Sequence, residues 1–259
     1  MNNKKLSKWL WAAAIASYAF LYLPLIIVIV YSFNDSKLNA EWVGFTFKWY
    51  SILFNDGPML HAAWNSLLIA TATSFFATIF GTLAGLAMHK YKLKLLPLLL
   101  LTPLALPEIL MGVSLLIFFV MLNLTLGMVS ITLAHISFCI GFVAIVVRSR
   151  LAGMDESLVE AARDLGASPL TAFRLVTLPL IMPGVIAGAL MAFTLSIDDF
   201  VITFFTAGAG ASTLPLQIYS MIKIAVTPEV NAISTLLMLL TLALIVAASK
   251  LAPGAFKAN

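Results

Sequence analysis

The chain has 259 residues, of which 62% are hydrophobic and only 10% are charged, whereas a soluble domain carries about 25% charged residues. Its mean hydropathy of +1.05 is typical of a protein with segments long enough to cross a bilayer, so composition excludes an ordinary soluble domain and a disordered chain. The 15 basic and 11 acidic residues give a net charge of +4, which matters in a membrane protein through its distribution along the chain.

Six uninterrupted apolar windows predict six transmembrane helices, because each is long enough to cross about 30 Å of hydrocarbon as a helix. The windows are Leu10–Tyr31, Ser66–Met88, Leu95–Leu122, Met128–Val147, Val185–Phe205 and Val230–Ser249. Three lysines before the first window make it resemble a signal peptide. Its 22 residues exceed the apolar core of about 7 to 15 residues in a cleavable signal, which favours a retained anchor. We therefore expect an all-α membrane protein, with residues 1–259 forming a single transmembrane domain.

The distribution of basic residues predicts how these six helices are oriented. An even number of crossings places both termini on one side, and twelve basic residues fall on that side against three on the other. The twelve are Lys4, Lys5, Lys8, Lys90, Lys92, Lys94, Arg148, Arg150, Arg163, Arg174, Lys250 and Lys257, and the three are Lys37, Lys48 and Lys223. Because basic segments stay inside, we expect both termini in the cytoplasm.

The long outer connection, residues 32–65, is expected in the periplasm and is rich in aromatic side chains. Five of them lie close together in its second half: Trp42, Phe45, Phe47, Trp49 and Tyr50. Aromatic residues of this kind suit a belt at the membrane interface. The alternative is a surface that contacts an external partner or substrate.

The third window is expected to be a broken or kinked helix. It contains Pro97, Pro103 and Pro107, and each proline removes a backbone donor that a straight helix needs. Glu108 follows the last of these prolines directly. Broken transmembrane helices with a polar residue beside the break often line a cavity.

The long inner connection, residues 148–184, predicts two short helices around a turn. Residues 157–165 are helix formers with an apolar stripe, and Gly166 can supply the left-handed conformation that ends a helix. Ser168 and Pro169 suit the N-cap and the first residue of a second helix, which Pro179 is expected to end. Such an amphipathic helix pair can dock into a groove on a soluble partner, and the alternative is a solvated loop.

This inner loop resembles the E-A-A-x-x-x-G-x(9)-I-x-L-P signature of the membrane permease subunits of bacterial ABC importers. Six positions match, and Val176 replaces the isoleucine; the matching residues are Glu160, Ala161, Ala162, Gly166, Leu178 and Pro179. Segments 32–34, 194–199 and 228–232 extend the resemblance to the second permease subunit of spermidine and putrescine importers. The resemblance implies that these six residues couple the chain to an ATPase.

The resemblance also implies an assembly in the bacterial inner membrane. It comprises a second homologous permease, two copies of a cytoplasmic ATP-binding subunit and a periplasmic polyamine-binding protein. The sequence contains no G-x-x-x-x-G-K-[ST] motif, so ATP and Mg²⁺ are expected on the partner chain, and no catalytic residue, cofactor or metal site is expected here. His61, His89 and His135 are widely separated and are interpreted as structural, with His135 expected to hydrogen-bond to a neighbouring helix.

Three carboxylates, Glu108, Asp198 and Asp199, fall inside the predicted windows, where ionisable groups are costly and usually functional. Glu108 and Asp198 each lie 13 residues after the inner start of their windows, which places both about 20 Å from the cytoplasmic edge on a continuous helix. No basic residue lies inside any window. The acids therefore predict a path for a polyvalent organic cation, completed by a hydroxyl from Ser196 on the same helix face as Asp199 and an aromatic face from Trp49.

Alternatives remain open for these residues and for the function. The aspartates can pair with the partner permease, and Glu108 can cap a helix that restarts after Pro107. The coupling loop fits an importer of another solute equally well. A carrier driven by an ion gradient would use the same acids as a proton relay. The sequence does not distinguish putrescine from spermidine.

Overall fold

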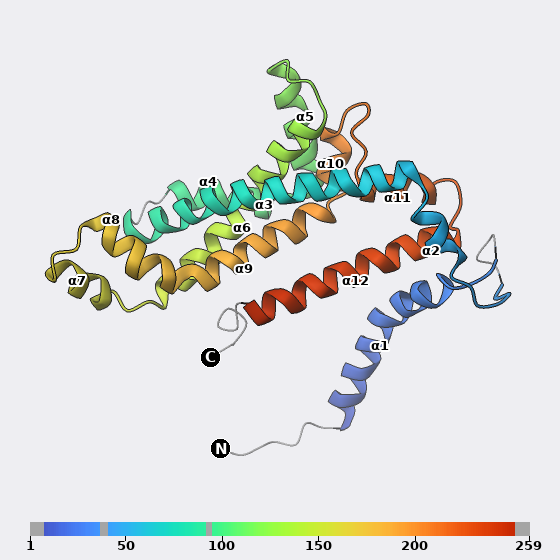
Figure 1. Ribbon diagram of the computed structural model, residues 1–259, viewed down its shortest axis with the longest axis horizontal. Coiled ribbons are helices and arrows are strands. Elements are labelled where there is room, and N and C mark those ends of the chain that lie inside the picture. The colour runs from blue at the N-terminus through green and yellow to red at the C-terminus, as the bar shows by residue number, and fades with distance from the viewer. Residues whose placement is uncertain (1–7, 37–40, 92–94, 252–259) are drawn as a thin grey trace. The chain divides into compact units, whose positions relative to one another are not determined.

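The computed structural model describes residues 8–36, 41–91 and 95–251, and these are almost entirely helical (Figure 1). An isolated β-bridge joins Asn34 and Phe45. Contacts divide the chain into two compact units. The small unit comprises Met1–Leu60 and Ile218–Leu239, and the large unit comprises His61–Gln217 and Leu240–Asn259. Six of the lysines that predicted the orientation lie outside the described residues: Lys4, Lys5, Lys37, Lys92, Lys94 and Lys257.

The helices of the described residues are, in chain order, α1 (Lys8–Tyr31), α2 (Lys48–Leu53), α3 (Gly57–Tyr91), α4 (Leu95–Ala105), α5 (Glu108–Met121), α6 (Met128–Ala152), α7 (Ser157–Asp164), α8 (Pro169–Ala172), the π-helical turn η1 (Phe173–Thr177), α9 (Leu178–Ile197), α10 (Val201–Thr206), α11 (Leu214–Ile222) and α12 (Pro228–Leu251).

Five helical runs in the described residues are long and apolar enough to cross a membrane. They are Trp9–Tyr31, Gly57–Tyr91, Met128–Ala152, Pro169–Ile197 and Pro228–Ala247. The pair α4 and α5 makes a sixth if it counts as one span, and its two halves meet at an angle of 110°. The expected break in the third window is therefore confirmed. Because the chain turns so sharply before Glu108, a depth estimated from a continuous helix does not apply to this residue, and its place in the membrane stays a prediction.

The fifth span differs from its prediction at both ends. It begins at Pro169 rather than Val185, since α8, η1 and α9 follow one another without a break. In the π-helical turn the Leu178 N–H bonds to the Phe173 carbonyl, and Pro179 then falls in the first turn of α9, where a missing donor is tolerated. Our expectation that Pro179 ends a helix is wrong. At the other end α9 stops at Ile197, so the two aspartates lie in a break rather than in the helix.

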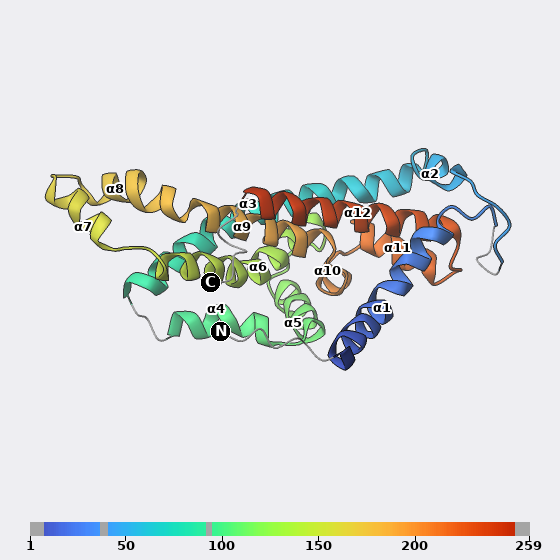
Figure 2. The same ribbon diagram turned by 90° about the horizontal axis from the view of Figure 1, so that it is seen from below.

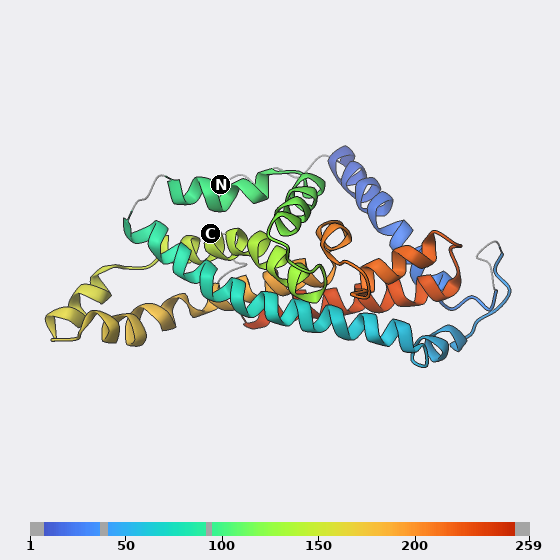
Figure 3. The ribbon, with the colours of Figure 1, turned by 90° about the horizontal axis from the view of Figure 1, so that it is seen from above.

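Helix α6 is the centre of the large unit, since it contacts α4, α5, α9 and α10. Glycines let some of its neighbours approach closely. Gly81 on α3 leaves so little space that a Cβ atom there would lie 2.5 Å from the Cβ of Val143. Gly141 on α6 faces the Leu100 carbonyl of α4 in the same way. Small residues at such crossings are the usual device of membrane helix packing. Seen from above, α3 runs along α6 (Figure 3).

Two broken segments pack together in the large unit. Helix α5 contacts α10, and a Cβ atom on Gly112 would lie 2.6 Å from the Phe205 ring. The same unit carries α7 and α8 at the end where α6 finishes and α9 begins, away from α5 and α10 (Figure 2). The acid-bearing break and the α7–α8 pair therefore lie at opposite ends of α9.

Candidate functional site

The candidate substrate path is built at the breaks that precede α5 and α10. Glu108 is the first residue of α5, after Pro107, which adopts an extended conformation (φ −56°, ψ 133°) that cannot continue α4. Asp198 follows the last residue of α9. Both acids are exposed. Because α5 packs on α10, the two helix breaks that carry Glu108 and Asp198 belong to the same part of the large unit.

The third acid, Asp199, is held inside the bundle, with 7% of its side chain exposed. Its Oδ2 accepts hydrogen bonds from the backbone N–H of Thr203 at 2.8 Å and from the hydroxyl of Thr203 at 2.8 Å. These bonds satisfy a donor in the first turn of α10, as a helix cap does. Asp199 therefore bonds to the first turn of α10 from outside the helix, while its neighbour Asp198 stays exposed.

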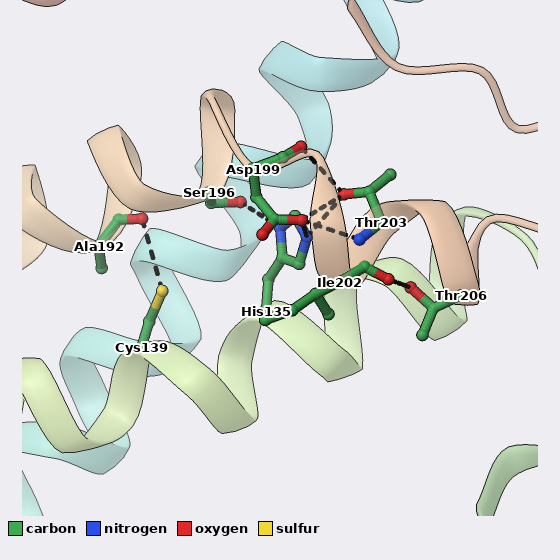
Figure 4. Close-up of polar contacts among 8 residues, drawn as sticks. All are labelled: His135, Cys139, Ala192, Ser196, Asp199, Ile202, Thr203 and Thr206. Carbon is green, nitrogen blue, oxygen red and sulfur yellow. Dashed lines mark hydrogen bonds and ion pairs between the residues drawn. The ribbon is translucent and has the colours of Figure 1, made fainter. Parts of the chain in front are cut away.

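His135 on α6 completes this polar cluster (Figure 4). The distance from its Nε2 to Asp199 Oδ2 is 3.1 Å, and the distance from its Nδ1 to Ser196 Oγ is 2.7 Å. The expected hydrogen bond from His135 to a neighbouring helix is confirmed. The windows contain no lysine or arginine, and this imidazole was not identified from the sequence as a partner of Asp199.

Sequence reasoning missed the link between His135 and the acids for a physical reason. His135 and Asp199 are 64 positions apart, and no helical or strand period relates residues on different elements. Ser196 and Asp199 do not share a helix face, since α9 ends at Ile197 between them. The imidazole connects them instead. The sequence offered one signal. A histidine is rare in an apolar window, and other windows of this chain carry acids that could be its partners.

Trp49, predicted as an aromatic face of the path, belongs to the small unit and is 8% exposed. Its indole N–H donates to the Asn34 carbonyl at 2.7 Å. The Asn34 side chain is itself buried and donates to the Glu41 carbonyl at 2.7 Å. Trp49 thus ties the start of α2 to the segment that follows α1. Of the five aromatic residues predicted to form a belt, Trp42, Phe45 and Phe47 are exposed.

The α7–α8 pair has the local structure that the sequence predicted. Gly166 adopts φ +88° directly after α7, and the Ser168 hydroxyl accepts the Thr171 N–H at the start of α8. Before α7, hydrogen bonds from Ser157 lower the pKa of the Asp155 carboxyl, since they stabilise its charged form. The signature residues Glu160, Ala161 and Ala162 lie on α7, whereas Leu178 and Pro179 begin α9.

A shallow cavity of about 360 Å³ lies between α7 and the helix that follows, lined by Ala162, Leu165, Gly166, Ala167, Thr171 and Leu175, among others. Two of these side chains are strongly exposed, Leu165 at 90% and Leu175 at 69%. Apolar side chains that protrude around a concave surface are typical of a docking face. His89 at the end of α3 contacts Glu156 before α7 at 3.2 Å and so connects this face to the bundle.

Comparison with known proteins agrees with this architecture. Residues 77–253 match the family described as "Binding-protein-dependent transport system inner membrane component". The spermidine/putrescine transport system permease protein PotC of Escherichia coli K12 is 45% identical over 247 residues, which cover 94% of each chain. The putrescine transport system permease protein PotI of the same organism is 41% identical over 250 residues, covering 92% of this chain and 89% of PotI.

Solved structures show the same fold at low sequence identity. A bacterial ABC transporter that imports the acidic polysaccharide alginate superposes with a TM-score of 0.73 at 16% identity, covering 96% of each chain. The MetNI methionine ABC transporter in an inward-facing conformation gives a TM-score of 0.66 at 20% identity, covering 78% of this chain and all of that one. By its sequence and its multiple apolar helices, the chain is a multi-pass membrane protein that belongs to the family of inner-membrane components of binding-protein-dependent transport systems.

Proposed function

We propose that this chain is a permease subunit of an ATP-driven importer that carries spermidine or putrescine from the periplasm to the cytoplasm. The observation that carries the proposal is the packing of α5 on α10, which places the helix breaks at Glu108 and at Asp198 and Asp199 in one part of the large unit. The relatives PotC and PotI are both polyamine permeases by name. Family membership supports the assignment to a binding-protein-dependent importer. The acids support a polyamine as its substrate.

Carboxylates at helix breaks suit a protonated polyamine for electrostatic reasons. Each ammonium group of a polyamine can contact a separate carboxylate, and the attraction is stronger in a medium of low dielectric than in water. Separated acids suit spaced ammonium groups better than a metal ion, which needs several oxygens within about 2.0 to 2.6 Å. In this proposal Glu108 and Asp198 contact the cargo, and Asp199 and Ser196 shape the path beside them. Trp49 lies in the small unit, and its part in the path stays a prediction.

The same proposal assigns the assembly. The chain forms one transmembrane permease domain with both termini in the cytoplasm and pairs with a second homologous permease. The loop 148–184 lies in the cytoplasm, where Glu160, Ala161, Ala162, Gly166, Leu178 and Pro179 couple it to two copies of an ATP-binding subunit. ATP and Mg²⁺ bind to those subunits, and a periplasmic polyamine-binding protein delivers the cargo. The exposed leucines beside Gly166 support this docking role.

The test is uptake of labelled spermidine and putrescine by the whole importer, purified with its co-expressed subunits and reconstituted in vesicles with ATP. We expect Glu108→Gln and Asp198→Asn each to lower uptake at least about tenfold, since each removes one charge contact of about 1.5 to 3 kcal/mol. The matched control is Glu41→Gln, which neutralises an exposed acid of the outer connection.

Unchanged uptake in the Glu108→Gln/Asp198→Asn double variant would contradict the path while leaving the family assignment in place. Reduced co-purification of the partner permease in these variants would assign the acids to an interface instead. Uptake without ATP by this chain alone would favour the carrier driven by an ion gradient.

A further inference from the structure

The buried histidine of α6 contacts three polar side chains around the α9–α10 break (Figure 4). His135 is 2% exposed. Besides its contacts with Ser196 and Asp199, its Nε2 lies 2.9 Å from the Thr203 hydroxyl. The partners come from the last turn of α9, from the break and from the first turn of α10. One side chain therefore spans the whole interruption in the fifth transmembrane run.

The partners of the imidazole indicate which of its nitrogens donates a hydrogen bond and which accepts one. A neutral imidazole has one donor and one acceptor nitrogen. Because a carboxylate only accepts, Nε2 carries the hydrogen that faces Asp199, and in the neutral imidazole Nδ1 then accepts the hydroxyl hydrogen of Ser196. The Thr203 hydroxyl can then donate to Asp199 Oδ2. Every polar group of the cluster has a partner in this arrangement, which a buried cluster requires.

The cluster positions groups rather than reacting with a substrate. Serine, histidine and aspartate also form hydrolase triads, but here Ser196 is 6% exposed and His135 is 2% exposed, so the hydroxyl is not presented to a cargo. Asp199 Oδ2 accepts from two side chains and from one backbone N–H. Its orientation is therefore set by α6 and α10 together.

We propose that His135 is the positioning residue of the polyamine path. By holding Asp199 inward and anchoring the end of α9 through Ser196, it fixes the backbone of the break so that the adjacent Asp198 stays exposed toward Glu108. This inference rests on the proposed function, because it assumes that Asp198 and Glu108 contact the cargo. His135 itself touches no cargo and acts through the residues it holds.

The first experiment replaces the imidazole in the complete reconstituted importer. His135→Leu removes both hydrogen-bonding atoms at similar volume, and His135→Gln keeps one donor and one acceptor. The informative readout is the ratio of spermidine to putrescine uptake, because a loss of folded transporter lowers both in proportion. A displaced Asp198 changes the uptake of spermidine and of putrescine by different factors, since the two polyamines differ in the number of ammonium groups.

We expect His135→Leu to lower uptake about tenfold or more, the cost of leaving buried polar groups without partners, and to shift the ratio at least about threefold. His135→Gln should restore both quantities to within about threefold of the parent, because it restores the donor to Asp199 and the acceptor to Ser196. If uptake per assembled transporter and the ratio stay unchanged in His135→Leu, the proposal is overturned.

A double-mutant cycle tests whether His135 acts through Asp199. We expect the His135→Leu/Asp199→Asn variant to be no worse than the poorer single variant. Adding Asp198→Asn to His135→Leu should lower uptake by a smaller factor than Asp198→Asn does alone, because the displaced carboxylate has already lost part of its contact with the cargo. If the losses of uptake caused by His135→Leu and Asp199→Asn multiply in the double variant, the positioning role is overturned. Failure of the proposed function looks different: Asp198→Asn and Glu108→Gln would then leave polyamine uptake intact in the parent background.

Discussion

At the scale of single residues, neighbours in sequence have different environments. Asp198 and Asp199 are adjacent, yet Asp198 is exposed while Asp199 has 7% of its side chain exposed and bonds within the bundle. Their chemistry is the same, so the difference comes from position at the break between α9 and α10. Neutralising Asp198 is therefore expected to act on the cargo, and neutralising Asp199 to act on the geometry of the break.

Gly166 allows a direct test of coupling at this scale. A Cβ atom at this position would meet nothing within 4 Å, so only its φ of +88° opposes a side chain. We expect Gly166→Val to strain the turn after α7 by about 1 to 2 kcal/mol and to lower both polyamine uptake and stimulation of the partner ATPase. The chain should still be inserted and assembled in the membrane.

Gly210 supplies the matched control for this prediction. It has the same φ of +88° and equally open surroundings but lies between α10 and α11. Gly210→Val therefore introduces the same backbone strain away from the α7–α8 pair and should retain coupling. Equal losses in both variants would show that strain alone, and not the position of the docking face, accounts for the effect.

At the scale of elements, the sequence predicts helix ends that are marked by a capping residue such as serine or glycine. It misses helix ends that depend on packing against other helices. Ser168 and Gly166 carry such signals, and both act as expected. The continuation of α8 into α9 through a π-helical turn could not be predicted, because Pro179 ordinarily indicates an end. Likewise the apolar composition of residues 185–205 conceals the break at Asp198, which is stabilised by bonds from another helix. Periodicity carries no information about such partners.

The packing of α3 on α6 yields a stability prediction. A Cβ atom on Gly81 would meet Val143 at 2.5 Å, whereas one on Gly57, in the first turn of the same helix, would meet nothing within 4 Å. We expect Gly81→Ala to destabilise the chain by about 1 to 3 kcal/mol through overpacking and Gly57→Ala to have little effect. Thermal unfolding in detergent, monitored by loss of monodisperse protein, measures the difference. Equal midpoints would contradict the close approach of the two helices.

At the scale of the whole molecule, orientation is the property on which the proposed direction of transport depends. Twelve of fifteen basic residues lie on the side assigned to the cytoplasm. We expect a reporter inserted within residues 168–173 to give a cytoplasmic signal and one within residues 35–42 to give a periplasmic signal. Exchanged signals would invert the arrangement and place the E-A-A loop beyond reach of any cytoplasmic ATPase.

The unbroken run from Pro169 to Ile197 gives the molecule a mechanical property. Its 29 residues extend about 43 Å at 1.5 Å per residue, with α8, capped by Ser168, at one end and Ser196, bonded to His135, at the other. We expect a displacement of α8 to be transmitted along this continuous helical run to the break at Asp198, where the hydrogen bond between His135 and Ser196 resists it.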